Sequence, residues 1–296
     1  MSTPQRQETR RPLVSIGMPV FNGENFIAQA IASILLQSFE DFELIISDNA
    51  STDGTREICE KFAAQDSRIR YHPQPRNLGA APNFDWCFEQ ARGEFFKWAA
   101  HDDVLREDFL EKSVALLKTD PKAVLCVYQV LHIGATGTTR ELGDMDCTRF
   151  FSNNPAVRFA AIYRAQTCHF IFGLFRHSAL ENSQLHGDYI GSDIVLLSEM
   201  ALRGPFVKCE EPIFIHRCHP QRFAASTFPN RKKASQWLKT DNPRSRASRR
   251  IVFVLRMIQA IRRSTQPGPD RRACYRFVVR YLKRKQTRKQ IFEEVV

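Results

Sequence analysis

Two adjacent carboxylates, Asp102 and Asp103, directly follow the apolar segment 95–100. Like charges side by side repel each other, and burying them is costly unless a cation lies between them. Mg2+ and Mn2+ prefer oxygen ligands, and Mg2+ commonly shares them with the phosphates of a substrate. The pair therefore predicts a metal site for a phosphate-bearing ligand. The alternative is a solvated pair that caps a helix expected at 107–119.

Polar side chains also follow three earlier apolar segments, 13–20, 42–49 and 69–73, which we predict to be strands. Helices are expected between them, and strands that alternate with helices form a mostly parallel sheet covered on both faces. Ligands of such sheets bind at the carboxyl ends of the strands. The residues expected at this edge, besides the Asp pair, are Pro19, Phe21, Asn22, Glu24, Asp48, Asn77 and Gly79.

Several function classes are disfavoured. The segment after the first predicted strand, "MPVFNGEN", contains neither a Gly-x-Gly-x-x-Gly pattern nor a Gly-Lys-Ser/Thr pattern. This argues against dinucleotide-dependent oxidoreductases and P-loop enzymes. The eight cysteines form no Cys-x-x-Cys pair, so a zinc or redox motif is poorly supported. No apolar run is long enough to span a bilayer, and the polar N-terminus does not resemble a secretory signal, so we expect a cytoplasmic protein.

The positive charge is concentrated at the C-terminal end. The net charge is +11, but residues 231–296 carry 20 Lys/Arg and 4 Asp/Glu, so the remainder of the chain is mildly acidic. We expect a loop or linker at 221–248 and a basic amphipathic helical tail at 249–296. Three partners remain open for this tail: an anionic membrane surface, the body of the protein or a second subunit, and nucleic acid. Nucleic acid is the least supported, because no recognition motif accompanies the charge.

Two stretches carry a family resemblance, "VSIGMPVFNGENFIAQAIASILLQSFEDFELIISDNASTDGT" and "PRNLGAAPNFDWCFEQARGEFFKWAAHDD". Together they resemble family 2 glycosyltransferases of the GT-A fold, and the resemblance extends over residues 12–220 after a flexible N-terminus at 1–11. It implies an α/β fold, a Rossmann-like three-layer sandwich with a mostly parallel central sheet. The basic helical tail would be an extension to that fold.

The resemblance also implies roles for individual residues in binding a nucleotide-sugar donor. Asp48 would bind the nucleobase, Asp102 the ribose or sugar, and Asp103 the Mg2+ or Mn2+ ion. His101 stands where many members carry a further Asp, which leaves fewer carboxylates for the metal. The remaining donor-site residues would be Pro19, Phe21, Asn22 and Glu24 around the nucleoside, and Asn77 and Gly79 in a turn facing the base and ribose.

The second half of the chain would supply the base that removes the proton of the acceptor hydroxyl. Asp193, at the start of a helix predicted at 192–204, is the first choice, and Asp188 is the rival. His219 is the preferred further metal ligand, with His216 and Arg217 as alternatives.

The expected reaction is an inverting, metal-assisted single displacement that moves a sugar to a saccharide or lipid-linked acceptor, in polysaccharide or glycolipid synthesis. No Gln-x-x-Arg-Trp signature is present, which favours transfer of one sugar per binding event. The tail would place the enzyme peripherally on the inner face of the cytoplasmic membrane. The competing hypothesis is a non-catalytic homologue that binds nucleotide sugars and acts as a scaffold through its tail.

Overall fold

A single nine-stranded sheet forms the centre of the protein, with strand order β3-β2-β1-β4-β8-β6-β9-β5 and β7 paired to β6. The computed structural model describes residues 11–134, 139–141, 148–165, 169–189, 191–219, 249–265 and 267–283. The linker expected at 221–248, the end of the tail, and all but the last residue of the N-terminal segment 1–11 lie outside the described residues.

The first half of the chain alternates strands and helices as the apolar pattern predicts. β1, β2, β3 and β4 pair in parallel, so their carboxyl ends share one edge. Val20, the last residue of β1, is the register partner of Asp48, the last residue of β2. In chain order the elements are β1 (Val14–Val20), α1 (Ile27–Leu35), β2 (Phe42–Asp48), α2 (Thr55–Gln65), β3 (Ile69–Pro73), α3 (Ala80–Glu89) and β4 (Phe95–Trp98).

The second half completes the sheet with strands of both directions. β6 (Leu125–Ile133) and β9 (Phe206–Arg217) are parallel to each other, whereas β8 (Leu174–Arg176) runs antiparallel to both β4 and β6. The short β5 (Val104–Leu105) pairs with β9, and β7 (Thr139–Glu141) pairs with β6, both antiparallel. β9 continues as one strand through Pro212, and its register against β6 shifts near Gln129.

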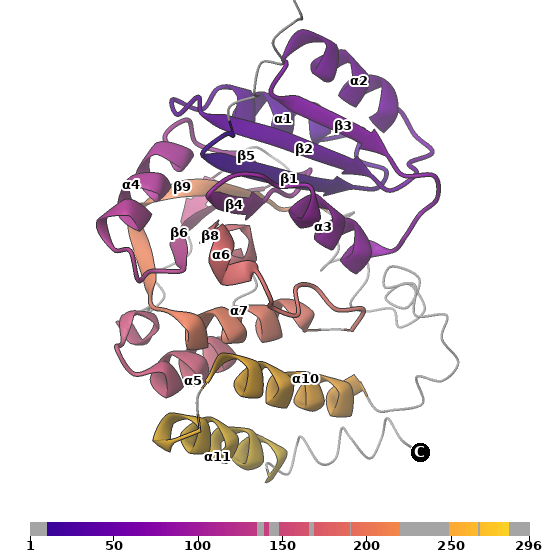
Figure 1. Ribbon diagram of the computed structural model, residues 1–296. Coiled ribbons are helices and arrows are strands. Elements are labelled where there is room, and N and C mark those ends of the chain that lie inside the picture. The colour runs from indigo at the N-terminus through magenta and orange to yellow at the C-terminus, as the bar shows by residue number, and fades with distance from the viewer. Residues whose placement is uncertain are drawn as a thin grey trace, which may run out of the picture.

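Helices cover both faces of the sheet, which confirms the predicted three-layer α/β arrangement (Figure 1). One core lies between the sheet and α1, α2 and α4 (Phe109–Thr119). A second core lies between the other face and a layer formed by α3, α5 (Pro155–Ala165), α6 (His177–Leu180) and α7 (Ser192–Arg203). Short 3-10 turns at Thr148–Phe151 and His169–Phe172 complete this layer.

The C-terminal helices α10 (Arg249–Ser264) and α11 (Pro269–Lys283) form a further layer beyond α5 and α7 (Figure 1). A third core fills this interface, and Val254, Met257 and Ile261 of α10 are buried there with Cys274 and Val278 of α11. Their apolar faces therefore pack against the body of the protein. Within the described residues, no helix is both long enough and apolar enough to cross a membrane.

Candidate active site

The carboxyl ends of β1, β2 and β3 are tied together by side chains from the loops that follow them. Asn49, directly after β2, donates from Nδ2 to Asn77 Oδ1 at 3.2 Å and to the Gly79 carbonyl at 3.1 Å. Its Oδ1 accepts the Leu78 N–H at 2.6 Å. Gly79 has a φ of 89°, a conformation that suits glycine because it has no Cβ. The turn expected to face the nucleobase and ribose is thus held against the end of β2.

Asp48 is almost fully buried at this edge, with 1% of its surface exposed. Its Oδ2 accepts the hydroxyl of Tyr71 at 2.8 Å, and its Oδ1 accepts the backbone N–H of Ser51 at 2.9 Å. Burial and the hydrogen bond to Asp48 both raise the pKa of Tyr71 above its ordinary value, so the phenol remains a donor. Asp48 is therefore a fixed carboxylate, positioned by β2, β3 and the loop after β2.

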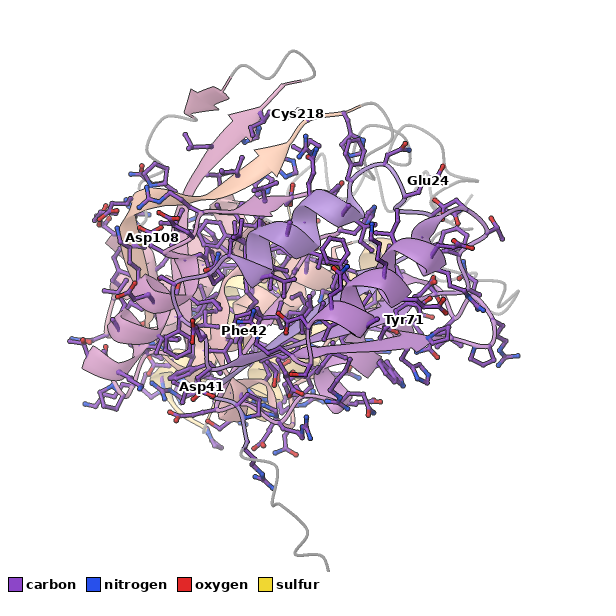
Figure 2. All side chains as sticks on the ribbon, turned by 90° about the horizontal axis from the view of Figure 1, so that it is seen from above. Glu24, Asp41, Phe42, Tyr71, Asp108 and Cys218 are labelled. Carbon is purple, nitrogen blue, oxygen red and sulfur yellow. The ribbon has the colours of Figure 1, made fainter. Side chains whose placement is uncertain are left out.

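The loop after β1 interlocks with the loop after β2. Asn22 Oδ1 accepts the Thr52 N–H at 2.9 Å, and Glu24 Oε2 accepts the Gly54 N–H at 2.8 Å. Figure 2 shows Glu24 and Tyr71 on one side of the molecule, away from Asp41, which precedes β2. Pro19 lies buried within β1, whereas Phe21 is 45% exposed. The side chains of Asn22 and Glu24 thus shape this edge, and Phe21 offers it an apolar ring.

The Asp pair after β4 is covered by the end of β9. His216 Nδ1 lies 2.9 Å from Asp103 Oδ1, and the Arg217 N–H donates to the same oxygen at 3.0 Å. His219 Nε2 lies 2.9 Å from Asp102 Oδ2. The structure thus places His219 against Asp102, and it is His216, an alternative from the sequence, that contacts Asp103.

Arg217 fixes the end of β9 over the pair. Its Nε donates to the Asp102 carbonyl at 3.1 Å, and its guanidinium lies over the ring of Phe26, which in turn contacts the His219 ring at 4.3 Å. Burial acts to raise the pKa of Asp102, but the neighbouring His101 and the contact with His219 outweigh it and hold the pKa below its ordinary value. Asp102 is therefore ionised at neutral pH.

These residues fit a metal that is shared with a ligand better than a metal held by protein alone. Among the described residues, no group of three or more His, Cys, Asp or Glu side chains is arranged to hold a metal ion. Mg2+ sites commonly use only one or two carboxylates and complete their coordination with phosphate and water. Asp103, a buried carboxylate that follows a strand at the ligand-binding edge, fits that type of site.

The two candidate bases lie on and before α7. Asp193 is in the first turn of the helix, where its Oδ1 accepts the N–H of the next residue, Ile194, at 2.9 Å. Burial raises the pKa of Asp193 above its ordinary value, which makes it a stronger base than a free carboxylate once it is ionised. Asp188 is exposed in the preceding segment and lines a small pocket between α3 and α10.

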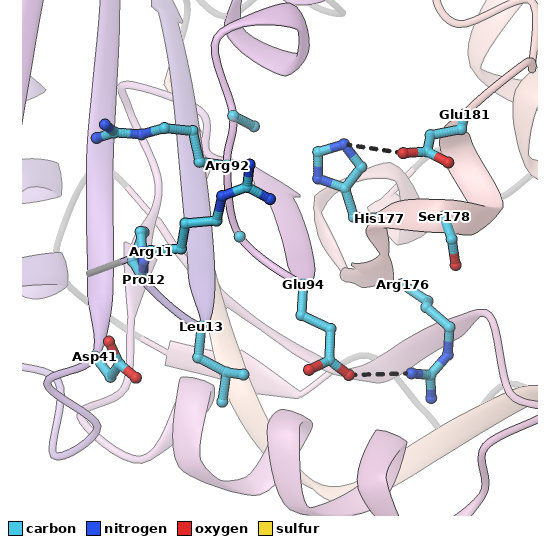
Figure 3. Close-up of a pocket in the computed structure, with 12 residues that line it drawn as sticks. Arg11, Pro12, Leu13, Asp41, Arg92, Glu94, Arg176, His177, Ser178 and Glu181 are labelled. Atoms are coloured by element: carbon cyan, nitrogen blue, oxygen red, sulfur yellow. Dashed lines mark ion pairs between the residues drawn. The ribbon is translucent and has the colours of Figure 1, made fainter. Parts of the chain in front are cut away.

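A second hollow lies at the opposite edge of the sheet. It has a volume of about 820 Å3 and is lined near the starts of β1, β2 and β4 (Figure 3). Arg92 and Arg176, two of its three arginines, already pair with Glu43 and Glu94. Ligands of parallel sheets bind at the carboxyl ends of the strands, so this hollow is separate from the candidate active site.

Two residues beside the site were not identified from the sequence. Tyr71 binds Asp48, and Lys97 is fully buried within β4, where its ammonium donates to the carbonyls of Trp98 and Phe172 at 2.9 Å. The sequence does contain a signal for Lys97, a lysine within an otherwise apolar strand, because a buried lysine requires hydrogen-bond partners. Tyr71 reaches Asp48 because β3 pairs with β2. No feature of the sequence near Tyr71 indicates this contact.

Comparison with known families gives one match that covers more than half of the chain. The sequence model of Glycosyl transferase family 2 matches residues 15–183. A putative glycosyltransferase of Bacillus subtilis strain 168, EpsH, is 27% identical over 211 residues, which are 70% of this chain and 56% of that protein. The chain spans roughly half or less of the length of the first curated relatives it matches.

Solved structures share the fold at low sequence identity. S. aureus TarS 1–349 in complex with UDP-GlcNAc has a TM-score of 0.67 and 16% identity, covering 95% of this chain and 79% of that one. The mannosyltransferase PcManGT of Pyrobaculum calidifontis, in complex with GDP-Man and Mn2+, has a TM-score of 0.52 and 15% identity, covering 97% and 85%. These likenesses confirm the GT-A fold class predicted from the sequence.

Proposed function

This chain belongs to glycosyltransferase family 2, and on that premise we propose that it moves a sugar from a nucleoside-diphosphate sugar to an acceptor hydroxyl. The transfer would be an inverting single displacement, in the synthesis of a polysaccharide or glycolipid. One observation carries the proposal. The carboxyl ends of four parallel strands bring Asp48, the turn at Asn77 and the Asp102–Asp103 pair to one edge, where Asn49 holds the turn and Arg217 holds Asp103 by hydrogen bonds.

The donor would lie along this edge with its nucleoside over the ends of β1, β2 and β3. The exposed ring of Phe21 offers an apolar surface for a base or ribose, and Asp48 offers a fixed acceptor for a base N–H. Because Gly79 has no side chain, the backbone of this turn would be able to approach the donor closely. The nucleotide-sugar complexes of TarS and PcManGT support a ligand of this class.

Asp103 would hold a Mg2+ or Mn2+ ion together with the diphosphate, with His219 as a further ligand. Such an ion, when bound, supplies Lewis-acid stabilisation of the leaving diphosphate. Four of the chain's own contacts prepare the pair for this role. His219 and Arg217 hold Asp102 from its carboxylate and its carbonyl, and His216 and the Arg217 N–H fix Asp103 Oδ1. The Mn2+ complex of PcManGT supports the choice of ion.

Asp193 would take the proton from the acceptor hydroxyl, with Asp188 as the rival. A base must come within hydrogen-bond reach of the proton it removes, and its pKa is best when it approaches the working pH. The raised pKa of Asp193 favours it on the second criterion. Asp188, which is exposed at the mouth of the pocket beside α3, is favoured by access.

The acceptor would be presented at an anionic membrane surface by the outer face of α11. After Pro269 at its start, the exposed residues of this helix are Arg272, Arg276, Val279, Arg280 and Lys283, four cations and one apolar side chain. Leu255 of α10 adds a second exposed apolar side chain. A basic face with apolar residues is attracted to anionic lipid headgroups. The inner faces of both helices are occupied by packing, so binding would be peripheral.

Calorimetric titration with UDP, GDP, dTDP and CDP, each with and without Mn2+, tests the proposed function. We expect one nucleotide to bind, and to bind more tightly with the metal. The natural sugar conjugates of that nucleotide are then tested for turnover. If no nucleotide binds under either condition, the glycosyltransferase proposal is wrong for this chain, and a scaffold role becomes the better hypothesis.

A further inference from the structure

A small pocket lies where three separate parts of the chain meet, beside the turn that follows β3. Its volume is about 280 Å3, and it is lined by the first turns of α3, the segment 184–189 and one residue of α10, Arg256. Sites for drug-sized ligands measure about 300–1,000 Å3, so this pocket is suited to a group as small as one sugar ring. A nucleoside diphosphate would not fit it.

Three residues that line this pocket have buried polar atoms without partners among the described residues. Tyr189 is 7% exposed, and its hydroxyl has no hydrogen-bond partner among the described residues. The same holds for Gln184 Oε1 and for His186 Nε2 in this part of the chain. Buried polar groups in proteins are nearly always hydrogen-bonded, so three of them around one pocket point to a polar ligand.

The backbone around these groups is held in a costly conformation. Leu185 has a φ of 47°, a left-handed conformation that a leucine rarely adopts. A Cβ on Gly187 would overlap the ring of Tyr189, so only glycine allows the ring its position. Strain of this kind persists only where the surrounding structure imposes it, and it clusters at ligand sites.

Hydrogen bonds fix the segment to all three of its neighbours. The His186 N–H donates to Asp85 Oδ1 of α3 at 2.9 Å. The Gln184 N–H donates to Glu199 of α7 at 3.2 Å, and Gln184 Nε2 donates to the Arg256 carbonyl of α10 at 3.0 Å. Hydrogen bonds to three helices therefore hold the pocket in place, and the C-terminal extension contributes to it through α10.

The pocket and the proposed donor site both adjoin the start of α3. α3 begins directly after the turn at Asn77–Gly79, and its residues Ala81 and Pro82 line the pocket. At the other end, Asp188 lines the pocket, and Asp193 lies four residues beyond Tyr189 in the first turn of α7. A group in this pocket would thus contact Asp188 and the first turns of the helix that follows the donor turn.

We propose that this pocket binds a sugar ring of the acceptor through Tyr189, Gln184 and Arg256, so that the C-terminal extension takes part in acceptor recognition. The inference rests on the proposed function. Sugar hydroxyls both donate and accept hydrogen bonds, and these side chains offer one hydroxyl, one amide oxygen and one guanidinium. The segment's link to α7 then couples an occupied pocket to the element that carries Asp193.

Asp85, which also lines the pocket, is a further side chain suited to sugar hydroxyls. Burial raises the pKa of Asp85 to about 7, despite the opposing hydrogen bond from His186 and with a smaller contribution from the charge of Glu89. Near neutral pH its carboxyl is therefore present in both protonation states and is able to donate to, or accept from, a sugar hydroxyl. Burial also lowers the pKa of His186 to about 3, so this ring remains neutral.

Saturation-transfer NMR on the full chain tests the proposal. The probes are the methyl glycosides of glucose, galactose, mannose and N-acetylglucosamine, added to protein saturated with Mg2+ and the nucleotide that binds in the calorimetric assay. We expect at least one glycoside to receive saturation. Tyr189→Phe and Arg256→Gln should each weaken its binding by about three- to tenfold, the value of one lost hydrogen bond.

Matched variants separate the pocket from the rest of the molecule. Tyr275→Phe removes the same hydroxyl from a residue of α11, and Arg262→Gln removes the same charge from an exposed residue of α10. Both should leave glycoside binding unchanged. Nucleotide affinity should be the same in all four variants, which also shows that they are folded.

Each other outcome overturns the inference. If the nucleotide binds but no glycoside does, the pocket is not an acceptor site, and the proposed function stands. If a glycoside binds equally to all variants, its site lies elsewhere. If adding the nucleotide sugar, in place of the nucleoside diphosphate, displaces the glycoside, the pocket holds the donor's sugar. Failure of every nucleotide to bind would remove the proposed function and this inference with it.

Discussion

Lys97 makes the stability of this protein depend on pH in a window that few other groups affect. Its ammonium is fully buried in β4, and burial lowers its pKa from 10.5 to about 7, against a smaller opposing effect of the Asp103 charge. A shift of this size corresponds to about 5 kcal/mol, because one pKa unit is worth about 1.4 kcal/mol. The folded state bears this cost below about pH 7 and loses it as the pH rises toward 10.5.

The sign follows from proton counts. Between about pH 7 and 10.5 the unfolded chain keeps the Lys97 proton and the folded chain has lost it, so the free energy of unfolding rises with pH. The pKa of Asp85 is raised to about 7, so above that pH Asp85 no longer changes the free energy of unfolding with pH. The buried thiols of Cys59 and Cys126, with pKa values raised to about 12, oppose the trend once unfolded thiols ionise near about pH 8.5.

The informative window is therefore about pH 7 to 8.5, where Lys97 alone should add about 1.5–2 kcal/mol to the free energy of unfolding. Lys97→Met should remove this slope. The substitution also leaves the carbonyls of Trp98 and Phe172 without their donor, at a cost of about 1–3 kcal/mol that does not depend on pH. Near pH 7 we expect the variant to be more stable than the wild type, by about 2 kcal/mol, with the advantage gone by about pH 8.5.

The assay is urea unfolding followed by tryptophan fluorescence, at several pH values across this window, for the wild type and Lys97→Met. Lys61→Met on α2 is the control, because Lys61 is exposed and its variant should follow the wild-type curve. If Lys97→Met and the wild type give parallel curves, the buried lysine does not discharge on folding, and the reasoning from burial is refuted.

Three further predictions concern function. Asp103→Asn keeps an oxygen for the Arg217 N–H but removes the charge, so metal-dependent donor turnover should be lost while metal-free nucleotide binding persists. Asp193→Asn should lower turnover by about 100- to 10,000-fold without changing donor affinity, whereas Asp188→Asn should lower it less. Reversing the charges of Arg276 and Arg280 should weaken binding to phosphatidylglycerol vesicles by about tenfold or more.

Each of these predictions has a contrary result, and the charge reversal also has a matched control. Turnover of Asp103→Asn at the wild-type rate would remove the metal assignment. If Asp188→Asn is the slower of the two base variants, Asp188 is the base. Charge reversal of Arg56 and Lys61, exposed on α2, is the matched control for the tail, and vesicles of phosphatidylcholine alone report binding that is independent of lipid charge. Equal vesicle binding by the two double variants would exclude α11 as the membrane face.

An amphipathic pattern predicts the helices of the tail but not the surface that their apolar faces contact. The tail's helices were predictable because apolar residues recur at helical spacing between arginines. The same pattern suits a membrane, a second subunit or the body of the protein. The structure directs Val254 and Ile261 inward against α5 and α7 and leaves Ile251 and Leu255 exposed. That choice depends on the apolar surfaces of α5 and α7, which lie earlier in the chain. The tail's own sequence does not encode them.

The sequence by itself determined the alternation of strands and helices and the polar residues that end each strand. Both are local properties, set by apolar periodicity and turn chemistry within a few residues. Only the tertiary structure decided that His216 contacts Asp103 and that His219 contacts Asp102, and that Arg256 joins a pocket with Asp85. These contacts join residues more than a hundred positions apart, such as Arg217 and Asp103, 114 positions apart. Their geometry follows from the pairing of β9 beside β6 and β5 and from the docking of α10 on α7, and no short stretch of sequence specifies it.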